Sequence, residues 1–99
     1  PAEIEVALRA YPRSALARVI AMPDERLDQI AVLCLELVDG AAPDDADVIG
    51  FLRERIAAYK VPKRVLYFAP GEIPLTASKT KVVDDELRKL VAKRMDEAT

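Results

Sequence analysis

Histidine is absent from this chain of 99 residues, and cysteine occurs only once, as Cys34. A disulfide within the chain is therefore impossible, and histidine-based catalysis and Cys/His zinc binding are excluded. Because Cys34 lies inside an apolar run, we expect a buried and inert thiol. The apolar runs are much shorter than the ~20 residues of a membrane span, and no signal-peptide pattern appears. These absences predict a protein of the reduced cytoplasm without a membrane-spanning segment.

Glycine is also scarce. The three glycines, Gly40, Gly50 and Gly71, are isolated from one another, so a glycine-rich phosphate loop is absent. The sequence contains neither a G-x-S-x-G nucleophile motif nor paired cysteines at metal-binding spacing. Most acidic residues fall at predicted helix starts or on solvent faces, which argues against a paired-carboxylate site or a metal site. Lys and Arg total 15 and Asp and Glu total 17, so the net charge of −2 gives no reason to expect a nucleic-acid partner.

Apolar residues make up 52% of the chain and charged residues 32%, proportions typical of one soluble globular domain. Apolar periodicity predicts the order α-β-β-α-β-α, an α+β domain in which helices flank a small three-stranded sheet. The predicted elements are a helix over 1–11, strands over 15–22 and 29–38, a helix over 44–60, a strand over 64–69 and a terminal helix from about residue 83.

Two apolar patterns indicate where the core lies. The strand over 29–38 is apolar on both faces, so we expect it at the centre of the sheet, covered on each side. Its predicted faces are Leu33, Leu35 and Leu37 on one side and Ile30, Val32, Cys34 and Val38 on the other. In the helix over 44–60, the predicted core-facing stripe consists of Ile49, Leu52, Ile56 and Tyr59.

The basic residues are the strongest candidates for function. Lys60, Lys63 and Arg64 come together at a helix-to-strand corner, and Lys79 and Lys81 lie on the loop after that strand. Lysine is a compact charge on a flexible stem, suited to reach a phosphate or carboxylate oxygen held on another domain. In an adenylation step, such a cation stabilises charge that shifts among a carboxylate, an α-phosphate and departing pyrophosphate. The alternative is that these are solvated lysines of a surface loop, and the pattern alone favours that alternative.

Five segments resemble motifs of one enzyme superfamily, in matching order and spacing. They are residues 1–5 (P-x-E-[IV]-E), 19–24 (V-x-G-x-P-D), 50–63 (a helix ending in Y-K-x-P-[KR]), 73–82 (L-P-x-T-x-[ST]-G-K-[IV]) and 85–90, within the helix that follows. Together they make the chain similar to the C-terminal subdomain of the adenylate-forming enzymes. That superfamily includes acyl- and aryl-CoA synthetases, nonribosomal-peptide adenylation domains and luciferases.

The resemblance implies a catalytic lysine. In this superfamily the lysine directly before [IV] contacts the carboxylate and the phosphates during adenylation, and Lys81 holds that position before Val82. The usual Ser-Gly-Lys is one residue longer here, with Lys79 near the place of the glycine, so Lys79 is the alternative catalytic lysine. We favour Lys81 because its spacing to Val82 and to the terminal helix is preserved. Further candidates for binding substrate or cofactor are Lys60, Lys63, Thr76 and Ser78.

A second departure from the family pattern is Asp28, which stands where the family usually has a glycine before the central strand. We expect this change to alter only the turn that precedes the strand.

The resemblance further implies that residues 1–99 form the mobile C-terminal lid of a larger ATP-dependent acyl-CoA synthetase, a ligase of fatty acid metabolism. Such an enzyme converts a carboxylate and ATP to an acyl-adenylate, and its lid then rotates so that the acyl group is transferred to the CoA thiol. ATP and Mg²⁺ are expected mainly on an N-terminal domain, which is the expected partner of this lid. Because the chain starts at Pro1 without an initiator Met, we expect an excised fragment that is inactive alone.

Several alternatives stay open at this point. A carrier-protein phosphopantetheine is an alternative acceptor to CoA. Fatty, aromatic and short-chain acids are all allowed as substrates, because acyl specificity is expected in the N-terminal domain. The competing class of protein is a non-catalytic ferredoxin-like module for ligand binding or interaction, since the element order resembles that fold without its first strand.

Overall fold

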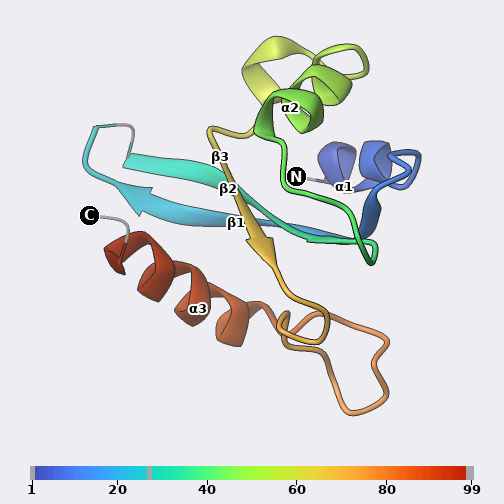
Figure 1. Cartoon of the computed structure of the whole chain (residues 1–99). Coiled ribbons are helices and arrows are strands. Elements are labelled where there is room, and N and C mark those ends of the chain that lie inside the picture. Colours follow the sequence, from blue (N-terminus) through green and yellow to red (C-terminus); the bar gives the residue numbers. More distant parts are fainter. Residues whose placement is uncertain (1, 27, 98–99) are drawn as a thin grey trace.

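The computed structural model describes residues 2–26 and 28–97. It shows a three-stranded sheet with helices on both faces (Figure 1). The order α-β-β-α-β-α predicted from the sequence is confirmed, with one short 3-10 helix, η1, added before the last strand. Pro1, the predicted start of the first helix, lies outside the described residues. The elements are α1 (Ala2–Leu8), β1 (Ser14–Asp24), β2 (Asp28–Leu37), α2 (Asp45–Arg53), η1 (Ala58–Lys60), β3 (Arg64–Phe68) and α3 (Asp84–Glu97).

β2 is the central strand, as its two apolar faces predict. β1 and β2 are antiparallel neighbours, whereas β2 and β3 run parallel and α2 lies in the connection between them. A parallel pair needs such a crossover, because the chain must return to the same end of the sheet.

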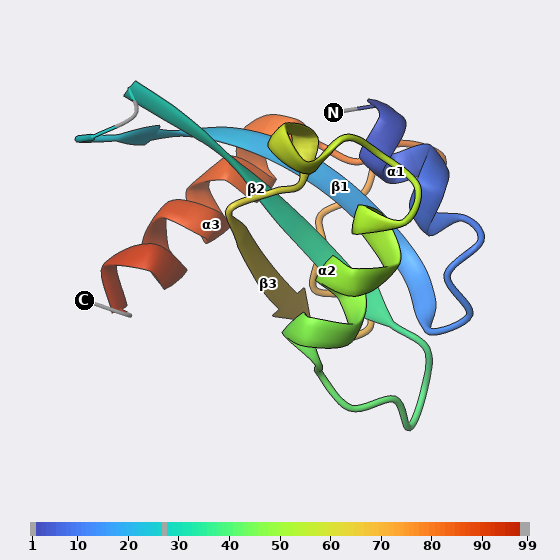
Figure 2. The same cartoon turned by 90° about the horizontal axis from the view of Figure 1, so that it is seen from above.

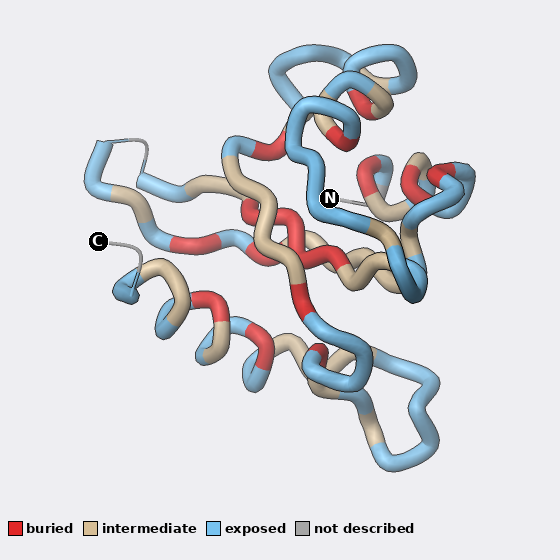
Figure 3. The backbone as a smooth tube through the Cα atoms, in the orientation of Figure 1, coloured by how far each residue is buried: buried red, intermediate tan, exposed pale blue. Residues whose placement is uncertain are grey.

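The core has two halves, one on each face of the sheet. Alternate residues of β2 enter opposite halves: Leu33 and Leu35 join the cluster under α1 and α2, and Val32 and Cys34 join the cluster under α3. Figure 1 shows α1 and α2 above the sheet and α3 below it, and Figure 2 shows the same layers from above. These four side chains are completely buried, and Figure 3 shows buried positions along β2 and on the helices. Burial on both faces confirms the predicted alternation.

The prediction for the second helix was wrong at its C-terminal end. α2 ends at Arg53 instead of continuing to residue 60. Its buried side chains are Val48 and Leu52, whereas Tyr59 of the predicted stripe is 83% exposed. Between α2 and η1 the backbone of Ala57 is extended (ψ 141°), so the helical periodicity on which the stripe depends does not reach Tyr59. Tyr59 therefore belongs to η1 and not to the core.

The other boundaries agree with the predicted ones to within three residues, and the largest difference is the end of α1 at Leu8 instead of residue 11. Tyr11 lies beyond the end of α1 and is nevertheless buried. β2 ends at Leu37, so Val38, which was expected on a core face, lies outside the strand and is 40% exposed.

Cys34 should resist alkylation in the folded protein. It is completely buried, and burial raises the pKa of its thiol to about 12. The reactive thiolate is therefore nearly absent at about pH 8, near the ordinary pKa of a free thiol. We expect iodoacetamide to leave Cys34 unmodified in buffer and to modify it in concentrated urea, as measured by intact mass. Rapid labelling of the folded protein would contradict this placement of the thiol.

Candidate functional site

The candidate site is the part of the β3–α3 connection that spans residues 73–83. We call it the lysine loop, because it carries Lys79 and Lys81. The two arms of the loop are held together. Leu75 and Val82 form an antiparallel bridge, and the backbone N–H of Thr76 donates to the carbonyl oxygen of Lys81 at an N–O distance of 2.8 Å. A loop closed in this way presents its tip as a defined structure.

Three hydroxyl side chains are linked at the tip of the lysine loop. Ser78 Oγ lies 3.3 Å from Thr76 Oγ1 and 2.7 Å from Thr80 Oγ1. The backbone N–H of Lys79 also donates to the carbonyl oxygen of Thr76, at 2.7 Å. Thr76 and Ser78 were predicted to bind substrate or cofactor, but their hydroxyl groups are engaged within the loop. These contacts order the tip, and each hydroxyl keeps further hydrogen-bonding capacity, so the predicted contacts of Thr76 and Ser78 with substrate or cofactor stay a prediction.

The side chains of Lys79 and Lys81 are both exposed. Over residues 2–26 and 28–97, no carboxylate forms an ion pair with either ammonium group. An exposed ammonium without an internal partner is free to approach an anion, and no existing contact is lost when it does so. The lysine loop therefore offers two cations to a phosphate or carboxylate that is brought up to it.

Lys79 and Asp28 share an uncommon backbone conformation. Their φ angles are 59° and 69°, and within the described part of the chain they are the only residues other than glycine with a positive φ. This left-handed region favours glycine, which has no Cβ atom. Both residues stand at positions where the family resemblance led us to expect a glycine. The backbone therefore keeps a glycine-like conformation at these two positions, although the residues are Lys and Asp.

An ion-pair network beside the lysine loop was not predicted from the sequence. Arg18 of β1 makes a two-pronged contact with Asp84, the first residue of α3, with Nε–Oδ1 at 2.9 Å and Nη2–Oδ2 at 2.7 Å. The Arg18 guanidinium holds the pKa of Asp84 below its usual range. The available signal was that Arg18 is the only charged residue in the predicted strand over 15–22, where apolar side chains are expected.

The segment that carries Lys60 and Lys63 precedes β3, and the lysine loop follows it, so the two lie at opposite ends of that strand. Figure 1 and Figure 2 show these connections on either side of β3. Lys63 directly precedes the first residue of β3, whereas the lysine loop comes after its last residue. Lys63 is exposed, and Lys60 Nζ pairs with Glu3 Oε2 at 2.9 Å, which holds the pKa of the Glu3 carboxyl below its usual range. The fold thus separates the predicted lysines into two basic patches.

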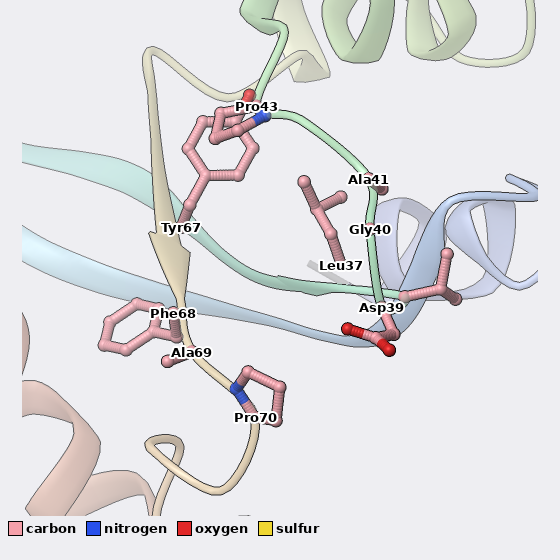
Figure 4. Close-up of a pocket in the computed structure, with 10 residues that line it drawn as sticks. Leu37, Asp39, Gly40, Ala41, Pro43, Tyr67, Phe68, Ala69 and Pro70 are labelled. Carbon is pink, nitrogen blue, oxygen red and sulfur yellow. The ribbon is translucent and has the colours of Figure 1, made fainter.

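The carboxyl ends of the parallel strands β2 and β3 border a pocket of about 290 Å³ (Figure 4). Crevices at this end of parallel strands commonly bind ligands. The walls come from the segments 37–43 and 67–70, and Asp39 is the only charged residue among them. A negative charge disfavours a phosphate group. The lysine loop is therefore a better candidate than this pocket for contact with a nucleotide.

Within residues 2–26 and 28–97, no group of three or more His, Cys, Asp or Glu side chains has the arrangement of a metal site. In the same ranges, none of the helices has the length and apolar character needed to cross a membrane.

The AMP-binding enzyme C-terminal domain family matches residues 3–80 of this chain. Among curated proteins, the chain is 39% identical to a 2-succinylbenzoate–CoA ligase from Geobacillus kaustophilus over 94% of its length. It is 38% identical to an indoleacetate–CoA ligase from Aromatoleum aromaticum over 95% of its length. Among solved structures, a fatty acyl CoA synthetase from Mycobacterium tuberculosis gives a TM-score of 0.83 at 26% identity, over 95% of this chain.

The chain belongs to the AMP-binding enzyme C-terminal domain family, as the resemblance of its motifs predicted. It spans 18% of the length of each of the three proteins named above. The range matched by the family ends at Thr80, one residue before Lys81. An assignment for Lys81 must therefore come from the motif and from the geometry of the lysine loop.

Proposed function

We propose that residues 1–99 act as the mobile C-terminal lid of an ATP-dependent carboxylate–CoA ligase, with Lys81 as the lysine that promotes adenylation. In this proposal the lid is one part of a larger enzyme, whose N-terminal domain holds most of the contacts to ATP, to Mg²⁺ and to the acid. The observation that carries the assignment is the glycine-like backbone of Lys79, with its φ of 59°. If Lys79 replaces the motif glycine, Thr80 is the extra residue and Lys81 is the motif lysine.

The charge of Lys81 and the hydrogen-bonded backbone that carries its side chain suit this chemistry. Attack of a carboxylate oxygen on the α-phosphorus of ATP forms the acyl–phosphate bond and breaks the bond to pyrophosphate, so negative charge shifts among the oxygens of these groups. An ammonium group close to the carboxylate and the α-phosphate stabilises that charge more in the transition state than in the ground state. Because the backbone of Lys81 is bonded to Thr76 across the loop, the ammonium is carried on an ordered support.

The separation of the two basic patches supports a lid that serves two half-reactions. A lid that rotates between half-reactions presents different surfaces to the reacting groups. The lysine loop lies at one end of β3, and Lys60 and Lys63 lie at the other. In the proposed cycle, the lysine loop serves adenylation, and the patch of Lys60 and Lys63 then faces the phosphates of CoA. Lys63 is exposed and can make such a contact directly, whereas Lys60 must first break its ion pair with Glu3.

The proposed substrates are a carboxylic acid, ATP and CoA. The relatives named above carry the names of two aromatic acids and of fatty acyl groups. Because we expect the acid to be bound mainly by the N-terminal domain, aromatic and fatty acids both stay within the proposal. The enzyme would then act either in fatty acid metabolism or in the metabolism of aromatic acids. A cytoplasmic location, where ATP and CoA are supplied, is part of the same proposal.

A two-stage assay on the full-length enzyme that carries this domain tests the proposal. ATP–pyrophosphate exchange with 2-succinylbenzoate, indoleacetate or a fatty acid reports adenylation, and thioester formation with CoA reports acyl transfer. We expect exchange that depends on one of these acids, followed by a CoA thioester. If the acyl group is transferred to a phosphopantetheinylated carrier protein and not to CoA, the acceptor in this proposal is the carrier protein. Binding without any exchange would favour a non-catalytic module.

Lys79→Gly should stabilise the domain slightly and leave adenylation active. Glycine adopts a positive φ without the strain of a Cβ atom, although it also gains freedom in the unfolded chain, so the expected gain is about 1 kcal/mol or less. Thermal unfolding and pyrophosphate exchange measure the two effects. Thr80→Gly is the matched control, because φ is not positive at Thr80 and the same change should lower stability. Loss of pyrophosphate exchange in Lys79→Gly would identify Lys79 as the catalytic lysine.

A further inference from the structure

Arg18 holds the start of α3 against β1. Its side chain lies on the α3 face of the sheet, as do those of Ile20 and Met22 on the same strand. Its two contacts with Asp84, at 2.9 and 2.7 Å, use Nε and Nη2 on the arginine and both oxygens of the carboxylate. Two-pronged pairs of this kind are more directional than single ion pairs. The position and the orientation of Asp84 relative to β1 are therefore both restrained.

Glu5 of α1 extends this contact to the other face of the sheet. β1 is an edge strand, so its outer N–H groups have no strand partner. One of them, the N–H of Val19, donates to Glu5 Oε2 at 3.0 Å, while Glu5 Oε1 lies 3.3 Å from Arg18 Nη1. Figure 1 shows that α1 and α3 cover opposite faces. The chain of contacts from Glu5 through Arg18 to Asp84 thus links these two helices around the edge of β1.

Asp84 lies at the base of the lysine loop. The residue before it, Val83, closes the loop, because its N–H donates to the carbonyl oxygen of Pro74 at 2.9 Å. The carbonyl oxygen of Val83 also accepts the hydrogen bond from the N–H of Leu87 at 3.0 Å, in the first turn of α3. Lys81 is three residues before Asp84. A displacement of Asp84 therefore shifts the arm of the loop that carries Lys81.

We infer that Arg18 is a positioning residue for Lys81 and that the Glu5–Arg18–Asp84 chain makes α1 and the lysine loop move as one rigid unit. The inference rests on the proposed function, because it assigns Arg18 a role in adenylation. In the proposed enzyme the N-terminal domain joins the lid before α1. Rotation about that joint is transmitted to Lys81 only if α1 and the lysine loop are rigidly connected.

The exposure of the pair favours a geometric role over a purely stabilising one. The side chains of Arg18 and Asp84 are 36% and 40% exposed. Ion pairs with this much exposure to solvent contribute little to the free energy of unfolding. Restraint of the loop base in a fixed direction is what a two-pronged arginine contact adds to such a site.

Arg18→Met in the full-length enzyme tests this role. We expect kcat for pyrophosphate exchange to fall about 10- to 100-fold, because misplacement of a catalytic group by an ångström is enough for such a loss. KM for ATP should change less than about threefold, since ground-state binding is not altered. Arg18→Lys, which keeps the charge without the fork, should recover part of kcat. The matched control, Arg88→Met, removes an arginine whose ion pair with Asp85 at 3.3 Å stays within α3, and it should keep the wild-type kcat.

Amide hydrogen exchange on the same proteins separates positioning from unfolding. In Arg18→Met, the amides of Thr76 and Val83 should exchange about tenfold faster or more, while Leu33 of β2 keeps its protection. Unchanged kcat, or equal acceleration in β2 and in the lysine loop, overturns the inference. A wild-type enzyme without pyrophosphate exchange rejects the proposed function. If the wild-type enzyme is active and Arg18→Met is equally active, only the role of Arg18 is rejected.

Discussion

Lys81→Ala should lower the rate of acyl-adenylate formation by about 10²- to 10³-fold, the loss typical when one electrostatic contact to developing charge is removed. The substitution leaves the lysine loop closed, because the backbone N–H and carbonyl of Lys81, and not its side chain, bond to Thr76. The loss should therefore appear in kcat for pyrophosphate exchange while the unfolding temperature stays at the wild-type value.

Lys79→Ala is the matched control, since it removes the same charge two residues away in the same loop. We expect it to reduce kcat much less than Lys81→Ala, because in the proposed assignment Lys79 takes the place of the motif glycine, which has no side chain. If Lys79→Ala abolished adenylation and Lys81→Ala left it intact, the assignment of the two lysines would be reversed. If neither variant changed kcat, the proposed role of the loop lysines would be wrong.

The central strand could be predicted from the sequence because its pattern is local. Consecutive residues such as Val32 and Leu33 point to opposite faces of the sheet, and both are apolar. A strand that is apolar on both faces must be covered on both. The end of α2 could not be predicted in the same way. Ile56 and Tyr59 continue the helical spacing, so the apolar pattern marks neither the end of α2 at Arg53 nor the extended backbone of Ala57.

The lysine loop could also be located from the sequence, because its motif is contiguous. The backbone conformation on which the proposed assignment of Lys79 and Lys81 rests could not, since a lysine gives no sign in the sequence that its φ is 59°. Arg18 stood out as a charge in an apolar strand, but its partner Asp84 is 66 residues away. Contacts between such distant residues follow from the packing of α3 on the sheet, which local patterns do not specify.

Leu33→Ala should lower the free energy of unfolding by about 2–5 kcal/mol, the range for removal of a fully buried leucine side chain. Leu33 is completely buried on β2, where it pairs with Val19 of β1 and Val65 of β3. Strands on both sides and helices above leave the cavity little room to collapse. The loss is large because small domains have only about 5–15 kcal/mol of stability in total. Urea unfolding of the 99-residue chain should show a midpoint lower by about 1 M or more.

Leu75→Ala is the matched control, because it removes the same atoms from a side chain that is 37% exposed on the lysine loop. We expect it to lower the free energy of unfolding by about 1 kcal/mol or less. Equal shifts of the two midpoints would mean that the two-sided core around β2 is not what stabilises the domain. Well below its unfolding temperature, Leu33→Ala should still support adenylation in the full-length enzyme, because Leu33 lies outside the lysine loop. Lys81→Ala should show the opposite behaviour, stable but inactive, so the two variants separate the residues that hold the fold from the residue that acts in the reaction.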